Sequence, residues 1–295
     1  MSYGFRWSIR RLRVSLGLLP FLTVGVGLLL AGALPAAPDA PDQAKDGEPK
    51  ADEHESEIQL AARTIVEGIK MTALMGDERQ RLELLKQPVL RYGDLARNND
   101  KGTVWVWQRS GRPQAVMELF RGDGSRVWVH AIHSLSADAL DGDFGALAPH
   151  WTPPREAVQW KDLAAAQSPA GRPAARARQI KDLAQRFTAH EFWDPNNSRF
   201  ELRLLVQPAC KYSDPEGGLL DGALFLLCHA TNPEVVLLIE AVQEDGGPKF
   251  RYALARLGHA ELHVAFEGKE VWRQERAGII KPTDPYWFLV RGVNP

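Results

Sequence analysis

The chain has 295 residues, 44% of them apolar, so it can bury a sizeable core and its length suggests one or two domains. Lys and Arg number 36 against 37 Asp and Glu, a net charge of −1 that gives the protein no electrostatic reason to bind nucleic acid.

Residues 1–37 predict a signal peptide or a membrane anchor. Four arginines, at positions 6, 10, 11 and 13, precede an uncharged run from Val14 to Pro38. Small residues near 31–37 suit cleavage, whereas the length of the apolar run suits a retained anchor. Either form places the folded part in the periplasm or cell envelope. Cleavage would leave 32 basic and 37 acidic residues. Residues 38–55 are rich in Pro, Ala and charge and predict a disordered linker.

An internal repeat follows. Arg79–Asp94 (RQRLELLKQPVLRYGD) and Arg199–Asp214 (RFELRLLVQPACKYSD) match at 8 of 16 positions without a gap, at an offset of 120. The same offset superposes Gly102 on Gly222 and Pro113 on Pro233. The pattern predicts a duplicated unit.

The two units are expected at 56–137 and 173–277. In the first, Ser56–Gln59 resembles a capping box and apolar spacing predicts a helix over about 57–74. In the second, Pro173 suits a first helical position, and the helical pattern stops before Asp194. After each helix, short apolar runs separated by Gly, Pro and Asp predict at least four antiparallel strands.

Residues 138–172 form a proline-rich connector, which is expected to pack over a sheet through Trp151 and Trp160. The C-terminal tail, 278–295, is also broken by prolines, and its aromatic run Tyr286–Phe288 is expected to be pinned to the core, with a partner surface as the alternative.

These elements predict an α+β fold of two tandem repeats, each one helix plus an antiparallel β-meander, with a cystatin-like outline. Strands such as ALFLLC are apolar on both faces, so each sheet needs a helix on one face and a second layer, the sister unit, on the other. The comparison with cystatins concerns the fold alone.

The two cysteines, Cys210 and Cys228, lie symmetrically about a turn centred near residue 219. A hairpin closing there would place them opposite each other, and an oxidising compartment would permit a disulfide. Two buried free thiols are the alternative.

The blocks DGALFLLCHATNPEVVLLIEA, LRLLVQPACKY and FRYALARL resemble a family of uncharacterised exported proteins of planctomycete bacteria over about residues 80–275. The resemblance implies export and an envelope setting. It brings no activity, cofactor or catalytic residue.

The repeated polar residues are the first candidate binding site: Tyr92 and Asp94 in one unit, Tyr212 and Asp214 in the other. A structural role, with aspartates in turns and tyrosines packed, is the favoured interpretation. Trp105 and Trp107 share a strand face and could stack on a sugar, although Phe225 and Leu227 replace them in the second unit, which favours a core role.

No nucleophile elbow, phosphate loop, carboxylate pair or metal-ligand set is recognisable, so neither catalytic residues nor cofactors are predicted. The leading hypothesis is a non-enzymatic envelope protein that binds a partner or a glycan. The alternative is a hydrolase-like or ligand-binding enzyme with a pocket between helix and sheet; its candidate residues are Tyr212, Asp214, Arg203, His229 and Glu240. A purely structural assembly module is the third possibility.

Overall fold

The computed structural model describes residues 51–94, 100–122, 125–145, 148–164 and 166–292, so the expected signal or anchor and residues 38–50 of the linker lie outside it. Helix α1 spans Ala51–Glu67 and helix α2 spans Pro173–Ala184. Pro173 occupies the first turn of α2, as expected. Among the described residues, neither helix combines the length and apolar character needed to cross a membrane.

Eighteen strands form three antiparallel sheets among the described residues. The small sheet has the order β2 (Glu78–Arg81), β1 (Lys70–Met75), β8 (Ala139–Asp143). The six-stranded sheet contains β18 (Tyr286–Gly292), β7 (Val127–Ser134), β6 (Arg112–Arg121), β5 (Asp100–Arg109) and β3 (Glu83–Leu84), with β4 (Leu90–Asp94) also paired to β5. The nine-stranded sheet contains β17 (Lys269–Gln274), β16 (Glu261–Phe266), β10 (Phe187–Phe192), β11 (Arg199–Leu204), β13 (Leu219–His229), β14 (Asn232–Glu244), β15 (Gly247–Arg256) and β9 (Lys161–Asp162), with β12 (Cys210–Asp214) paired to β13.

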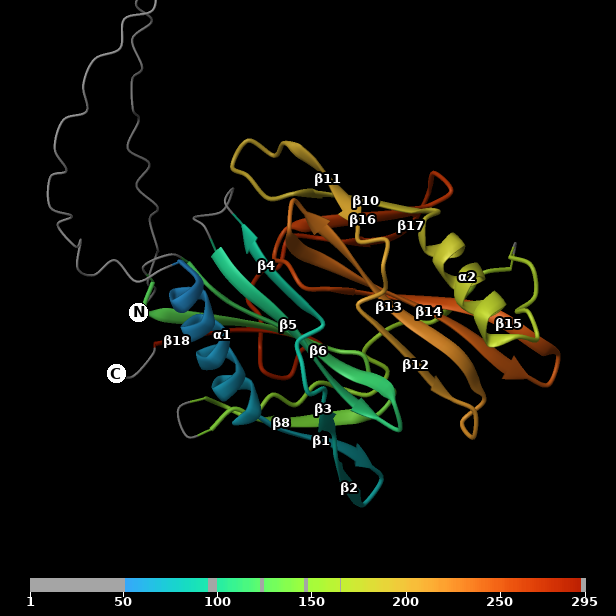
Figure 1. Cartoon of the computed structure of the whole chain (residues 1–295), viewed down its shortest axis with the longest axis horizontal. Coiled ribbons are helices and arrows are strands. Elements are labelled where there is room, and N and C mark those ends of the chain that lie inside the picture. Colours follow the sequence, from blue (N-terminus) through green and yellow to red (C-terminus); the bar gives the residue numbers. More distant parts are fainter. Residues whose placement is uncertain (1–50, 95–99, 123–124, 146–147, 165, 293–295) are drawn as a thin grey trace, which may run out of the picture. The chain divides into compact units, whose positions relative to one another are not determined.

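The two large sheets pack against each other, and each carries one helix on its outer face (Figure 1). Alternation along β5 explains this layering: Val104 and Val106 face the other sheet, whereas Trp105 and Trp107 join the core under α1. The even-numbered residues Leu224 and Leu226 of β13 likewise join the core between the sheets. Both faces of each sheet are therefore buried, which accounts for the continuous apolar runs in the sequence.

The expected α+β class with two helix-plus-meander repeats is wrong. The fold is mostly β, with large curled sheets and only two helices among the described residues. Lys70–Met75, expected within the first helix, is strand β1, and it pairs with β8 in a separate sheet. The tail supplies β18, which pairs with β7. Such long-range pairings between segments cannot form inside a self-contained meander.

The strands around the shared sequence motif nevertheless pair in matching registers. Tyr92 lies opposite Gly102 and Tyr212 lies opposite Gly222, which preserves the offset of 120 seen in the sequence. The next pairings agree as well, with Trp107 opposite Ala115 and Leu227 opposite Val235.

The glycines of this arrangement are required by the tyrosine rings. A Cβ atom at Gly102 would lie 2.2 Å from Cζ of Tyr92, and one at Gly222 would lie 2.3 Å from Cε2 of Tyr212. Each ring therefore occupies the space above a glycine on the neighbouring strand. The Tyr and Gly identities in the sequence repeat are explained by this close approach.

The connector and tail cross these layers as ordered segments. Trp151 is fully buried, and its indole nitrogen donates to the carbonyl oxygen of Asp284 over 3.0 Å. In the tail, Tyr286 and Trp287 are buried, as the pinned-tail interpretation anticipated. Together these contacts bring the connector beside the tail, where segments of both line a cleft.

Candidate functional site

A cleft of about 580 Å³ lies among the described residues. Its walls come from the connector, β15, β17 and the chain between β17 and β18, and His133 of β7 also lines it. Segments distant in sequence therefore converge on it, which is typical of ligand sites. The apolar part of its lining includes Val158, Leu254, Trp272 and Ile280.

One of the buried groups that line the cleft is a neutral imidazole. His133 is buried, and its Nδ1 donates to the carbonyl oxygen of Ser134 over 2.7 Å. Burial lowers the pKa of His133 to about 4, because an imidazolium would lose its hydration there. The ring therefore carries no charge at neutral pH.

Arg256 holds the surrounding chain in place. Its guanidinium donates to three carbonyl oxygens, those of Gly258, Ala260 and Glu275, over 2.8–3.0 Å. It also lies 5.3 Å from the ring centroid of Tyr286, whose hydroxyl donates to the carbonyl oxygen of Leu257 over 2.8 Å. Because these donors are engaged by the protein, Arg256 and Tyr286 serve to shape the cleft wall.

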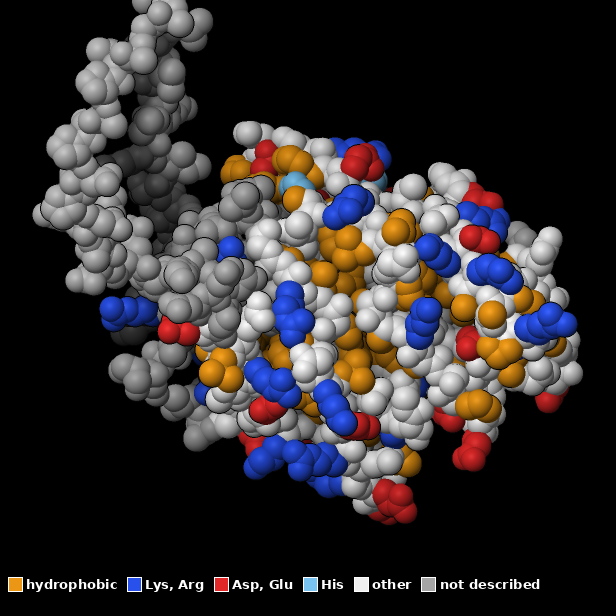
Figure 2. Space-filling view, viewed as in Figure 1, with side chains coloured by type: hydrophobic (Ala, Val, Ile, Leu, Met, Phe, Trp, Pro, Cys, Tyr) orange, Lys and Arg blue, Asp and Glu red, His pale blue; other side chains and the backbone are white. Residues whose placement is uncertain are grey.

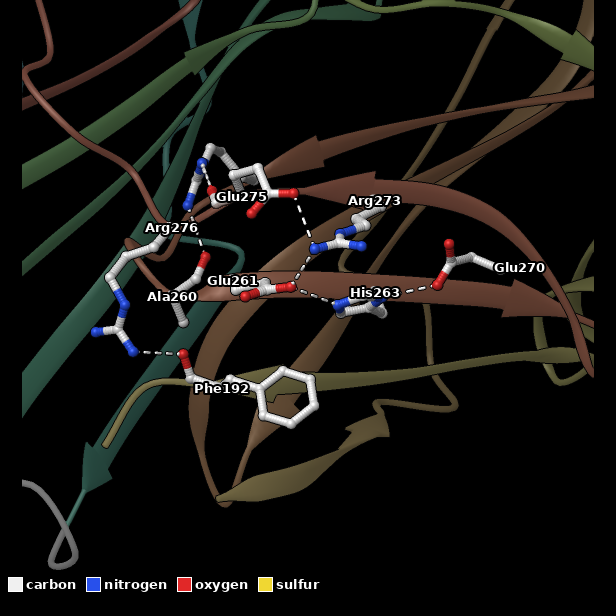
Figure 3. Close-up of polar contacts among 9 residues, drawn as sticks. Phe192, Ala260, Glu261, His263, Glu270, Arg273, Glu275 and Arg276 are labelled. Carbon is white, nitrogen blue, oxygen red and sulfur yellow. Dashed lines mark hydrogen bonds and ion pairs between the residues drawn. The ribbon is translucent and has the colours of Figure 1, made fainter. Parts of the chain in front are cut away.

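Arg273, which lines the cleft, belongs to a paired network of charges on and next to β16 and β17. Arg273 contacts Glu261 over 2.7 Å and Glu275 over 2.9 Å, and His263 lies between Glu261 and Glu270 (Figure 3). Hydrogen bonding from His263 lowers the pKa of both carboxyls, Glu261 and Glu270. Figure 3 also shows Arg276 reaching the carbonyl oxygen of Phe192, a bond of 2.8 Å that ties the end of β17 to β10.

Exposed groups at the cleft remain able to contact a ligand. Gln159 is exposed and Gln274 is partly exposed, while Ile279 is 93% exposed. Lys161 donates to the carbonyl oxygen of Val271 over 2.7 Å. A cleft lined by amide groups, apolar side chains and an uncharged imidazole can bind a polar, uncharged molecule.

The sequence candidates Tyr92 and Tyr212 do not line this cleft. The hydroxyl of Tyr92 donates to the carboxylate of Glu118, whereas Tyr212 is buried between the sheets. Burial, followed by the nearby Glu240 carboxylate, raises the pKa of Tyr212 well above its usual range. Asp94 ends β4, and its side chain lies outside the described part. Asp214 accepts from the backbone of Gly217 over 3.2 Å, a turn contact.

Trp105 and Trp107 are 2% and 1% exposed under α1, so they present no surface on which a sugar could stack. Their indoles are core groups, and the favoured interpretation of the pattern agrees with this placement. The exposed aromatic candidate near the surface is instead Trp193, which is 38% exposed beyond the end of β10.

The expected juxtaposition of the cysteines is wrong. The hairpin turn spans 215–218, before residue 219, so Cys210 lies opposite Leu224, four residues before Cys228 on β13. That separation is roughly 13 Å along a strand, beyond the reach of a disulfide. Both thiols are free, and burial raises the pKa of each to about 12.

The residues named for the enzymatic alternative do not form one site: Glu240 lies near Tyr212, and Arg203 lies on the strand next to that of His229. His229 contacts the buried carboxylate of Glu191 over 2.6 Å, whereas Arg203 donates to the carbonyl oxygen of Ala230 at the surface. Glu240 is fully buried and contacts Arg112 over 2.9 Å and Arg251 over 2.8 Å.

Sequence reasoning missed the partners of Glu240. Arg112 comes from the other sheet and Arg251 from β15, and both guanidiniums lie over the ring of Trp160 in the connector, at 5.3 and 4.6 Å from its centroid. Arg251 lies opposite Glu240 across the β14–β15 hairpin, so the turn at Gly246-Gly247 could have indicated that partner, whereas no spacing in the sequence links Arg112 to Glu240. Among the described residues, no group of three or more His, Cys, Asp and Glu is placed to hold a metal ion.

Comparison with known proteins found no matching family model, no matching curated protein and no matching solved structure.

Proposed function

We propose that this chain is an exported, non-enzymatic protein of the cell envelope that binds a glycan in the 580 Å³ cleft. The observation that carries the proposal is that exposed amides, apolar side chains and the uncharged imidazole of His133 line one cleft. Carbohydrates present hydroxyl groups that pair with amides and apolar ring faces that pack on such walls. Binding a partner protein in the same cleft is the less favoured form of the proposal.

The setting of this function is inferred from the chain's beginning. The basic start and long apolar run support export, with cleavage and anchoring as the two alternatives. The resemblance to exported planctomycete proteins supports the same setting. Matching registers around the shared motif support descent of β4–β6 and β12–β14 from one duplicated segment.

The proposal is tested by applying the full chain to an array of neutral envelope oligosaccharides. A double variant, Gln159→Ala with Gln274→Ala, removes both amides from the cleft without disturbing the core. We expect it to lose roughly tenfold in affinity, because the hydroxyl groups of the ligand lose their partners.

The matched control is Gln80→Ala, an exposed amide on β2, which we expect to leave binding unchanged. No binding to any oligosaccharide, or binding that survives the double variant, would contradict the proposal.

A further inference from the structure

Two smaller clefts lie where each helix meets the shared Gln-Pro motif. The first, of about 210 Å³, lies between α1 and the bend before β4. The second, of about 70 Å³, lies between α2 and the bend before β12. We call them the α1 cleft and the α2 cleft. The residues that line them in equivalent places are Gln87 and Gln207, Pro88 and Pro208, Arg91 and Lys211, Thr103 and Ala223, Trp105 and Phe225.

These five pairs all obey the offset of 120, so the motif that the sequence repeats is also the wall of a repeated cleft. Backbone geometry explains part of the repetition. Leu85 and Leu205 donate to the opposite strand on one side of the bend, over 3.0 and 2.9 Å, and the chain rejoins that strand two residues before Arg91 and Lys211. The proline suits such an interruption of the ladder. The exposed glutamine side chains are not needed for the bend.

Each cleft has a basic group on both walls. Arg63 on α1 and Lys181 on α2 occupy the helix wall, opposite Arg91 and Lys211 on the strand wall. Lys and Arg side chains are spread over the face drawn in Figure 2, around exposed apolar groups. A positive cleft on a chain of net negative charge attracts anions.

The two lysine side chains that line the α2 cleft form no ion pair with any residue that the structure describes. Within the described part of the chain, no carboxylate lies within ion-pair distance of Lys181 or Lys211, and the acid that lines this cleft, Asp221, is paired with Arg176. In the α1 cleft, Arg91 donates to Gln87 over 2.9 Å and Arg63 contacts Glu67 over 2.7 Å. The glutamine there holds the strand-wall cation in position.

We infer that the α1 and α2 clefts each bind the carboxylate of a uronic acid unit in an acidic glycan. In the α2 cleft the opposed Lys181 and Lys211 receive the carboxylate, and in the α1 cleft Arg91 receives it, because Arg63 is paired with Glu67. In both clefts the glutamine amide pairs with a hydroxyl group, and the proline and aromatic ring supply the apolar contact. The inference extends the proposed glycan binding to a different site and a different sugar class. The larger α1 cleft has room for more of the ring than the α2 cleft.

The test is calorimetric titration of the full chain with trigalacturonate, in parallel with inorganic phosphate and with a glutamate tripeptide. We expect trigalacturonate to bind best. Arg91→Gln and Lys211→Gln should each weaken binding roughly fivefold, and together by more, because each removes one exposed cation contact. Lys269→Gln, an exposed substitution on β17 away from both clefts, should change nothing.

Equal binding of phosphate or of the peptide would overturn the inference, since it would show attraction to charge alone. Undiminished trigalacturonate binding in the Arg91→Gln, Lys211→Gln double variant would also overturn it. If that binding were lost instead in the Gln159→Ala, Gln274→Ala variant, the main cleft would be the site, and the proposed function would survive without this inference.

Discussion

The two sheet regions β4–β6 and β12–β14 share one backbone register and fill it with different side chains. Under α1 the first presents Trp105 and Trp107, where the second presents Phe225 and Leu227 under α2. In the core between the sheets the second region has the larger side chains: Leu224 and Leu226 stand where the first region has Val104 and Val106. The shared tyrosine, glycine and bend positions therefore maintain the strand register. The sizes of the core side chains can differ between the two faces of each sheet, provided that the total volume is kept.

Charge marks the second difference between the regions. The β12–β14 region buries Glu240 and receives Arg112 from the β4–β6 region as its partner. The position 120 residues earlier is Phe120, which is apolar. The ion pair between the sheets is thus present once, so the two regions are unequal in how they hold each other.

The largest effect is expected from Glu240→Ala. Its carboxylate is fully buried, and its removal leaves Arg112 and Arg251 facing each other without a compensating charge. We expect a loss of about 3–5 kcal/mol in the free energy of unfolding. Urea denaturation followed by tryptophan fluorescence measures it.

The matched control is Glu244→Ala. Glu244 lies on β14, as Glu240 does, and its exposed carboxylate pairs with Lys249. It should cost less than about 1 kcal/mol, as exposed pairs do. Equal losses for the two variants would show that the buried pair does not join the regions energetically.

The second effect is a loss of stability in acid that originates in β7, the strand that pairs with β6 of the first region. Burial lowers the pKa of His133 to about 4, below the value of 6.5 expected for an unfolded chain. The unfolded state therefore binds the proton first as pH falls. Stability is complete above about pH 6.5 and declines by about 3 kcal/mol by pH 4 for this residue alone.

The register of β14 and β15 places Ala255 where β6 and β7 place His133, because Val236 lies opposite Ala255 and Val116 lies opposite His133. His133→Ala makes the strands that follow the two regions, β7 and β15, alike at this point. Whatever its effect at pH 7, it should reduce the slope of unfolding free energy between pH 6.5 and 4. An unchanged slope would assign the acid sensitivity to other groups. His130 and His259 would then be the next residues to substitute, because burial lowers the pKa of each to about 4.

Local patterns in the sequence were sufficient for the features that depend on neighbours along the chain. They located α2 at Pro173, the antiparallel strands, and the core role of Trp105. They failed where distant segments decide the outcome. Lys70–Met75 has helical apolar spacing but finds a strand partner in β8, and the tail joins β7. The main cleft was unpredictable for the same reason, since its walls come from segments that only the folded chain brings together.

The smallest effects test the tyrosine and glycine positions that both regions share. Gly222→Ala should destabilise the protein by about 2–3 kcal/mol, because the ring of Tyr212 is buried and cannot yield to a Cβ atom at 2.3 Å. Gly102→Ala should cost only about 1 kcal/mol, because Tyr92 is partly exposed and its ring can move outward. Double-mutant cycles that combine Gly222→Ala with Tyr212→Leu, and Gly102→Ala with Tyr92→Leu, isolate the contact of each pair. We expect the larger coupling energy for the Tyr212 pair. Equal coupling in both regions would mean that the neighbouring strands, and not the exposure of the ring, determine the cost of filling the glycine position.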